Sequence, residues 1–338
     1  MLKAEYNKIT LIFKRPGGTS RGVLKTKDSW ILKVWDEQNP RCAGMGECSI
    51  IYGLSPDPVD GYEDKLNELT ANIQHSSNVD LTDYPSIRFG LETALLDLQT
   101  GGKKLLFPSS FTEGKRGIPI NGLVWMGDFE FMREQIIEKL ETGYNCIKLK
   151  IGAIDFDKEL ELLKLLRKDF GKTDLEIRVD ANGAFSPANA LEKLKRLSEY
   201  HIHSIEQPVK QNQWEEMAML CDKSPIDIAL DEELIGLNDK KISLMLKTIN
   251  PQYIILKPSL LGGLTRSEKV IEMAKHYQTG WWITSALESN IGLNAFAQWT
   301  ATLNNPMPQG LGTGMLYTNN FPSPLYIEKA HLYFNPLH

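Results

Sequence analysis

The sequence is poor in the features that mark several large classes of protein. It has four cysteines and six histidines among 338 residues, and no two cysteines form a C-x-x-C pair. This spacing excludes zinc ribbons and thioredoxin-type redox motifs. Sparse, unpatterned cysteines in a chain of this length are typical of a reducing compartment, so we expect a cytoplasmic protein.

Long apolar runs and a strong charge of one sign are missing as well. No apolar run approaches the roughly 18 residues that a membrane helix requires, and the first residues lack the apolar stretch of a secretion signal. The formal net charge is −5, without a long run of lysine and arginine. We therefore expect a small molecule as the partner, and neither nucleic acid nor a membrane.

What remains is the composition of a folded protein with a large core. Hydrophobic residues make up 42% of the chain and charged residues 24%, and the length predicts about two domains. The N-terminal part combines β-type runs, residues 8–13 and 30–35, with a helical segment at residues 87–98. Strands followed by helices are typical of a small α+β unit.

From about residue 117, short apolar runs alternate with amphipathic helices such as residues 156–170 and 191–200. Six or more strand–helix units in series predict an α/β protein with a modified TIM barrel, and a doubly wound sheet is the alternative. The predicted strands are residues 146–150, 176–180, 204–206, 226–231, 253–257 and 281–285.

Three regions follow from this pattern. We expect an α+β capping domain over residues 1–114 and a β/α barrel over residues 115–314. Residues 315–338 lose the alternation of strand and helix, and we expect them to pack on the capping domain.

Charged residues end the predicted strands at a nearly constant spacing. Asp180 precedes Glu206 by 26 residues, Asp231 follows 25 residues later, and another 26 residues lead to Lys257. One strand–helix unit has this length, so the four residues should share the rim formed by the C-terminal ends of the strands. Barrels of this kind build their active sites at that rim.

Three carboxylates that converge at one rim repel each other unless a cation lies between them. Oxygen ligands without histidine or cysteine select a hard ion. We therefore expect Mg²⁺, with Mn²⁺ as a substitute, on Asp180, Glu206 and Asp231.

Lys148 and Lys150 lie two residues apart on one predicted strand, so both should point to the same side. Positive charge from the metal and from Lys148 favours the neutral form of Lys150, which can then act as a base. The chemistry that needs these parts is removal of a weakly acidic proton next to a carboxylate. The metal and a cationic lysine would hold the resulting enediolate.

Strand periodicity also sorts three neighbouring residues. Arg178 is in phase with Asp180, so we expect it to point inward and to orient a lysine. His201 and His203 are out of phase with Glu206 and should face the surrounding helices as structural residues rather than bind a metal.

Two glycine-rich segments have structural interpretations. Residues 310–314 precede no long amphipathic helix, so they predict a tight turn after the eighth strand rather than a dinucleotide site. Residues 17–22 lack the signature of a P-loop and predict a mobile loop that closes over the barrel mouth.

Taken together, these motifs resemble the enolase superfamily, and within it the muconate-lactonizing subgroup. The resemblance covers essentially the whole chain. The matching segments are residues 44–47, 147–150, 179–182, 205–208, 231–232 and 256–258.

Three further segments, residues 121–127, 285–292 and 310–314, resemble o-succinylbenzoate synthases, especially those of the Bacteroidetes type. This resemblance implies Mg²⁺-dependent syn-dehydration of 2-succinyl-6-hydroxy-2,4-cyclohexadiene-1-carboxylate to o-succinylbenzoate, a step towards menaquinone.

The same resemblance implies roles for the three lysines. Lys150 removes the proton and then assists departure of hydroxide from the same face. Lys257 stabilises the anion from across the ring, and Lys148 acts on Lys150 or on the substrate carboxylate. Weaker candidates for substrate binding or support are Arg178, Asn182, Ser285 and Ser289.

Four alternatives differ in what they require. An N-succinylamino acid racemase would use Lys150 and Lys257 as bases on opposite faces. A dipeptide epimerase would need an acid for the substrate amine, and residues 301–324 contain none. A Schiff-base aldolase leaves the three carboxylates unexplained. A non-catalytic metal-binding module gives no reason for lysines on both sides of the metal.

Overall fold

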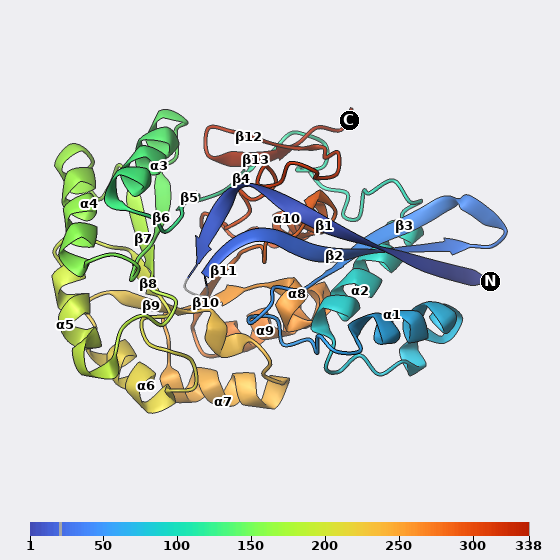
Figure 1. Cartoon of the computed structure of the whole chain (residues 1–338), viewed down its shortest axis with the longest axis horizontal. Coiled ribbons are helices and arrows are strands. Elements are labelled where there is room, and N and C mark those ends of the chain that lie inside the picture. Colours follow the sequence, from blue (N-terminus) through green and yellow to red (C-terminus); the bar gives the residue numbers. More distant parts are fainter. Residues whose placement is uncertain (20–21, 338) are drawn as a thin grey trace.

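The computed structural model of the chain describes residues 1–19 and 22–337. Its N-terminal part is an antiparallel sheet, in the order β1-β2-β3, with helices packed against it (Figure 1). The predicted strands at residues 8–13 and 30–35 lie within β1 and β2, and the predicted helix lies within α2. The elements are β1 (Leu2–Thr19), β2 (Gly22–Asp36), β3 (Asn39–Ser49), α1 (Tyr62–Ala71), η1 (Ile73–Asn78) and α2 (Pro85–Gln99).

Glycines allow α2 to pack directly on β3. A Cβ atom at Gly44 would lie 2.0 Å from the carbonyl oxygen of Ala94, and one at Gly46 would lie 1.9 Å from that of Gly90. Both distances are far inside van der Waals contact with a backbone that cannot move away. The helix therefore lies close enough to β3 to fix the position of the strand's next residue, Glu47.

The second part is a parallel sheet of seven strands that curls into a barrel, with helices on its outside (Figure 1). Its strands are β5 (Gly122–Val124), β6 (Cys146–Lys150), β7 (Glu176–Asp180), β8 (Ser204–Glu206), β9 (Asp227–Leu230), β10 (Tyr253–Leu256) and β11 (Gly280–Ile283). The helical elements are α3 (Phe129–Glu141), α4 (Phe156–Asp169), α5 (Pro187–Ser198), α6 (Trp214–Lys223), η2 (Glu232–Leu234), α7 (Asp239–Ile249), α8 (Pro258–Leu261), α9 (Leu264–His276) and α10 (Asn290–Thr302).

The strand order confirms the barrel over the doubly wound alternative. Neighbours in the sheet follow the order of the sequence from β5 to β11, without the reversal that defines a doubly wound sheet. Two parallel bridges, Thr284 with Gly310 and Ile120 with Gln309, connect β11 back to the start of the barrel. Residues 309–310 therefore stand where an eighth strand closes the ring.

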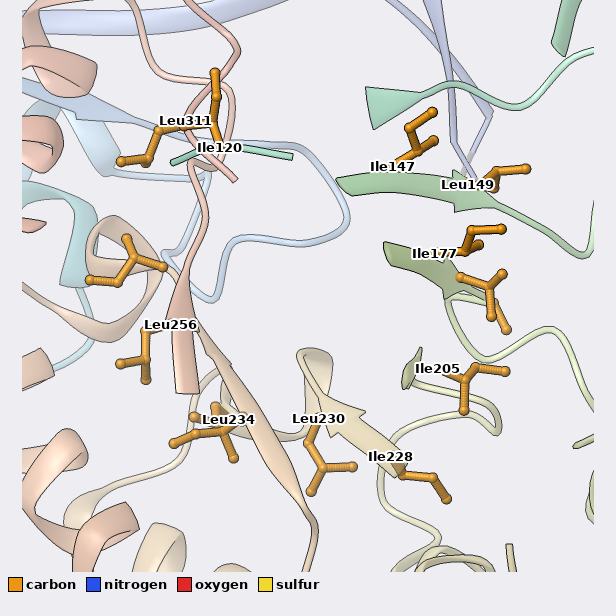
Figure 2. Close-up of a cluster of buried hydrophobic side chains, with 14 of the residues drawn as sticks. Ile120, Ile147, Leu149, Ile177, Ile205, Ile228, Leu230, Leu234, Leu256 and Leu311 are labelled. Carbon is orange, nitrogen blue, oxygen red and sulfur yellow. The ribbon is translucent and has the colours of Figure 1, made fainter. Parts of the chain in front are cut away.

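The main core lies between the strands and the surrounding helices. Ile147 and Leu149 on β6, Ile177 on β7 and Ile205 on β8 are at most 1% exposed and belong to one apolar cluster (Figure 2). They alternate with the charged residues of the same strands. Because successive strand residues point to opposite faces, burying this apolar set turns the charged set into the barrel.

The C-terminal segment contacts both parts of the molecule. Lys14 N of β1 donates to the carbonyl of Leu316 at 2.8 Å, and Phe13 forms an antiparallel bridge with Tyr317. Further on, a hairpin pairs with the start of the barrel region. Its strands β12 (Leu325–Glu328) and β13 (His331–Phe334) join β4 (Ile118–Pro119) in a small sheet. The boundaries at residues 114 and 315 stay predictions.

Among the described residues, no helix is long and apolar enough to span a membrane.

Candidate active site

Six charged side chains meet where the barrel strands end. Four of them lie on β6, β7 and β8, and the other two directly follow β9 and β10. Parallel strands bring their C-terminal ends to one rim, so the strand register places these residues together. The members of this mouth group are Lys148, Lys150, Asp180, Glu206, Asp231 and Lys257.

Asp180 lies at the centre of the contacts on one side of the mouth group. Its Oδ2 atom is 2.9 Å from Lys148 Nζ and 3.0 Å from Lys150 Nζ. Lys148 also forms an ion pair with Glu206. The four side chains are at most 13% exposed, so these ion pairs are shielded from bulk water.

The two carboxyl groups respond to this environment in opposite ways. Burial opposes the charged form of Asp180, but the ammonium groups of Lys148 and Lys150 outweigh it and hold the pKa of Asp180 well below its ordinary value. Burial, and after it the charge of Asp180, raises the pKa of Glu206 well above its ordinary value. The three carboxyl groups and three lysines of the site balance formally, but burial and the neighbouring carboxylates disfavour the charged form of Glu206.

Lys257 lies on the other side of the group and forms an ion pair with Asp231. Burial alone would lower the pKa of Lys257, but the carboxylates of Asp231 and Glu232 raise it. Lys257 is thus held as a cation. Asp231 Oδ1 is buried and has no hydrogen-bond partner among the described residues.

The mouth group fits a hard divalent cation by its donor chemistry. Its candidate ligands are the carboxylates of Asp180, Glu206 and Asp231, all at most 3% exposed. In the described part of the chain, no three acidic, histidine or cysteine side chains are gathered tightly enough to hold a metal ion. Lys148 and Lys257 bind the carboxylates instead. Crowded carboxyl groups and a buried oxygen without a described hydrogen-bond partner are what a divalent cofactor would satisfy.

Asn182 extends the site beside Lys150. Its Oδ1 atom accepts from Lys150 Nζ at 2.8 Å, and its Nδ2 donates to Glu232 Oε1 at 3.1 Å. Asn182 has a φ of 43°, in the left-handed region that asparagine tolerates better than most residues. The structure therefore places this weaker candidate in direct contact with the expected base.

A cavity of about 510 Å³ joins the mouth group to the capping domain. The β1 residues Lys14 and Arg15 line it from above, and Trp125 lines it from the loop after β5. Ser285 also lines the cavity, and its hydroxyl hydrogen-bonds that of Thr313 at 2.7 Å. The space is large enough for a substrate the size of a substituted six-membered ring.

Two of the weaker candidates lie away from the cavity. Ser289 is fully buried and does not line the cavity, and its hydroxyl donates to Glu47. Arg178 points into the barrel as predicted, but its Nε donates to Glu176 at 2.7 Å and its Nη1 to the Pro308 carbonyl at 2.9 Å. Its contacts therefore lie below the mouth group, and a role in orienting a lysine stays a prediction.

The predicted loop at residues 17–22 includes two positions, Ser20 and Arg21, that lie outside the described residues. Its first residues are part of β1 rather than a loop. A Cβ atom at Gly18 would lie 2.6 Å from the carbonyl oxygen of Met126, so the strand approaches the loop after β5 very closely. A lid role for the segment stays a prediction.

Sequence reasoning missed several residues of the cavity. Glu232 directly follows the proposed metal ligand Asp231, and this position was a signal that its side chain could reach the same site. Trp125 belongs to a segment used only for the family resemblance. Lys14 and Arg15 had no signal, because only the tertiary structure brings β1 over the barrel.

Comparison with known proteins agrees with this architecture. Residues 132–335 match the family described as enolase C-terminal domain-like. The o-succinylbenzoate synthase of Desulfotalea psychrophila is 51% identical, with 98% of each chain covered.

Solved structures give the same result. The crystal structure of MenC from Desulfotalea psychrophila superimposes with a TM-score of 0.87 at 48% identity, covering 98% of this chain and 99% of that one. A muconate lactonizing enzyme from Pseudomonas fluorescens, at 24% identity and a TM-score of 0.84, shares the fold over 98% of this chain and 93% of its own. The chain belongs to the enolase superfamily and, within it, to the o-succinylbenzoate synthase family of lyases.

Proposed function

We propose that the mouth group dehydrates 2-succinyl-6-hydroxy-2,4-cyclohexadiene-1-carboxylate to o-succinylbenzoate, with Lys150 as the base. One observation carries this assignment of roles. Lys150 and Lys257 line one cavity from β6 and from the end of β10, on either side of the strands that carry the buried carboxylates. A planar substrate held at the carboxylates would therefore have an amine on each face.

Asp180, Glu206 and Asp231 are the proposed ligands of the divalent cofactor, for which we propose Mg²⁺ with Mn²⁺ as a substitute. Oxygen-only ligands favour such hard ions over zinc or copper. When bound, the cofactor supplies positive charge to the substrate carboxylate as the neighbouring C–H bond breaks.

The lysines carry the proton transfers of the proposed reaction. Lys150 takes the proton from the carbon next to the ring carboxylate. The protonated Lys150 then gives a proton to the hydroxyl group on the same face, the C–O bond breaks, and water leaves as the ring becomes aromatic. Lys257, held as a cation by Asp231, stabilises the negative charge from the opposite face.

The test is direct. The purified enzyme is mixed with the cyclohexadiene substrate and Mg²⁺, and the loss of the diene absorbance is followed in parallel with Lys150→Ala and with a chelator. We expect turnover in the first sample alone. Absence of turnover by the unchanged enzyme with Mg²⁺ would contradict the proposal.

Racemisation of N-succinylamino acids is the second candidate, because two amines facing one cavity are also what proton exchange on both faces requires. The two activities separate by Lys257. Racemisation should stop when Lys257 is replaced by alanine, since each enantiomer needs its own base. Dehydration uses one face for both bond-breaking steps and should retain more activity.

We propose the cytoplasm as the location of the protein. All four cysteines are free thiols, which is typical of a reducing compartment.

A further inference from the structure

A buried carboxylate outside the mouth group lies behind the cavity, where the capping sheet meets the barrel. Glu47 on β3 is fully buried. Its Oε1 accepts from Ser29 Oγ at 2.7 Å and from Ser289 N at 2.9 Å. Its Oε2 accepts from Ser289 Oγ at 2.5 Å and from Gly292 N at 3.0 Å. Four donors use the full acceptor capacity of a carboxylate, and three of them belong to the start of α10.

Gly292 is needed for this contact. A Cβ atom there would lie 2.8 Å from Glu288 Cβ and 3.0 Å from Glu47 Oε2. The absence of a side chain lets the capping carboxylate reach the backbone of α10. Lys27 is also buried and donates to Ser49 Oγ at 2.8 Å; burial lowers the pKa of Lys27, and the nearby carboxylates of Glu288 and Glu47 offset part of that lowering.

The segment just before α10 forms one wall of the active-site cavity. Ser285, Ala286 and Leu287 line it. Leu287 has a φ of 60°, a left-handed conformation that is rare for leucine and costs on the order of 1–3 kcal/mol. Such a residue keeps its conformation only when its surroundings hold it there.

The surroundings of Leu287 supply that restraint from both sides. Tyr317 Oη donates to the Leu287 carbonyl at 2.7 Å. Glu288 Oε2 accepts from Ala286 N at 2.8 Å, and its Oε1 accepts from Ser259 Oγ at 2.6 Å, two residues after Lys257. The wall is thus tied to α8, the helix that follows Lys257. Glu47 holds the far end of the wall through Ser289.

We propose that Glu47 is a positioning residue that fixes the cavity wall formed by Ser285, Ala286 and Leu287. The capping domain then shapes the substrate site from behind the wall as well as covering it. Glu47 touches no reacting atom and acts through Ser289. The inference rests on the proposed function, since the wall is judged by the substrate that it holds.

The chain offers a matched control for simple domain docking. Glu92 on α2 also reaches from the capping domain to the start of a barrel helix. It accepts from Leu264 N at 2.6 Å and Thr265 N at 2.9 Å at the beginning of α9. Neither partner lines the cavity. Glu92 therefore shares the docking role of Glu47 without the contact to the wall.

The experiment compares Glu47→Gln with Glu92→Gln in steady-state kinetics at a temperature where both are folded. In either orientation of a glutamine at position 47, its NH2 group faces a backbone N–H, that of Ser289 or that of Gly292, so the anchor of the wall loses one acceptor. We expect about a ten-fold rise in KM for Glu47→Gln, with kcat changed less than about three-fold, because the wall binds substrate without transferring protons. For Glu92→Gln we expect KM within about two-fold of the unchanged enzyme.

A second readout needs no activity. Hydrogen exchange at the Ser289 and Gly292 amides should become at least about ten-fold faster in Glu47→Gln and stay unchanged in Glu92→Gln. The proposal is overturned if the two variants raise KM equally, or if exchange at these amides is unchanged in Glu47→Gln. If the unchanged enzyme fails to dehydrate the cyclohexadiene, the proposed function fails, and the exchange measurement still decides whether Glu47 holds the wall.

Ser289→Ala guards against a Glu47 variant that does not fold. It removes the hydroxyl donor and keeps the Ser289 amide, so we expect a smaller rise in KM in the same direction. In the double variant with Glu47→Gln, the fold rise in KM should be smaller than the product of the two single rises, since both changes act through one contact. Fully multiplicative effects on KM would overturn the proposed route through Ser289.

Discussion

The barrel interior holds two groups of side chains at different levels, each with charged members, and the two are built differently. The mouth group occupies the C-terminal ends of β6 and β7. A lower group begins two residues earlier on each of these strands. Its members are Cys146, Glu176, Arg178, Tyr253 and Trp282.

The two charged members of the lower group, Arg178 and Glu176, pair with each other at 2.7 Å. The guanidinium of Arg178 lies 4.3 Å from the centre of the Trp282 ring. Burial opposes ionisation of Glu176, but the charges of Arg178 and His203 together with hydrogen bonds from Cys146 and Arg178 outweigh it and lower the pKa of Glu176. The mouth group instead crowds three carboxyl groups and three lysines at a cavity. Reactivity therefore follows from several crowded charges beside a cavity, and not from one buried ion pair alone.

The largest effect that separates the two groups should come from Lys150→Ala. Without the amine, the proposed proton transfers have no carrier, and we expect kcat to fall by about 10³-fold or more. The measurement is the loss of the diene absorbance. Lys172→Ala, which changes an exposed lysine, serves as the control. Activity of Lys150→Ala within about ten-fold of the unchanged enzyme would assign the base to another residue.

The next largest difference between the mouth group and the lower group should be the response of protein stability to a metal ion. A cation that binds the folded mouth group stabilises it, so Mg²⁺ at a hundred times its dissociation constant should raise the free energy of unfolding by about 2.7 kcal/mol. The response should disappear in Asp180→Asn and persist in Arg178→Met, as measured by urea unfolding with and without Mg²⁺. A response that survives Asp180→Asn would place the metal elsewhere.

Arg178→Met tests the lower group itself. The change removes the ion pair with Glu176, the hydrogen bond to Pro308 and the stacking on Trp282. We expect the free energy of unfolding to fall by about 3 kcal/mol and kcat to stay within about ten-fold of the unchanged enzyme. A larger loss of kcat with retained stability would show that Arg178 orients a lysine of the mouth group, as the sequence suggests.

The mouth group was predictable because period and spacing agree along the barrel. Each strand places one charged residue at its end, and a repeat of about 26 residues repeats the placement. Parity also placed Arg178 inside the barrel, but it does not fix how far a long side chain reaches. The same rule was wrong for His203, whose ring lies 5.3 Å from that of Tyr253 in the lower group. His203 precedes the first residue of β8, so strand alternation does not extend to it.

The capping contribution was not predictable in the same way. The long β1 contains exposed and polar residues without a clear alternation, and only its pairing with β2 shows its full length. Glu47 was visible only as part of a family motif, because its partners on α10 lie more than 240 residues away. Contacts between distant segments leave no local period in the sequence.

The smallest effect concerns a buried carboxyl group that has no ammonium group beside it. Asp57 in the capping domain is 4% exposed and accepts two hydrogen bonds from Ser86, yet burial raises its pKa to about 7. Asp180, which is also buried, has its pKa lowered by two lysines. Because the folded state of Asp57 holds its proton more tightly than the unfolded chain, its contribution to stability is complete below about pH 4 and is lost as the pH rises through 7. We expect the free energy of unfolding to fall by about 2 kcal/mol between pH 5 and pH 7 from this group.

The measurement is urea unfolding of Asp57→Asn and of the unchanged protein across this pH range. The variant should lack this part of the pH dependence, with kcat unchanged. An identical slope of the unfolding free energy against pH in both proteins would show that Asp57 is ionised throughout.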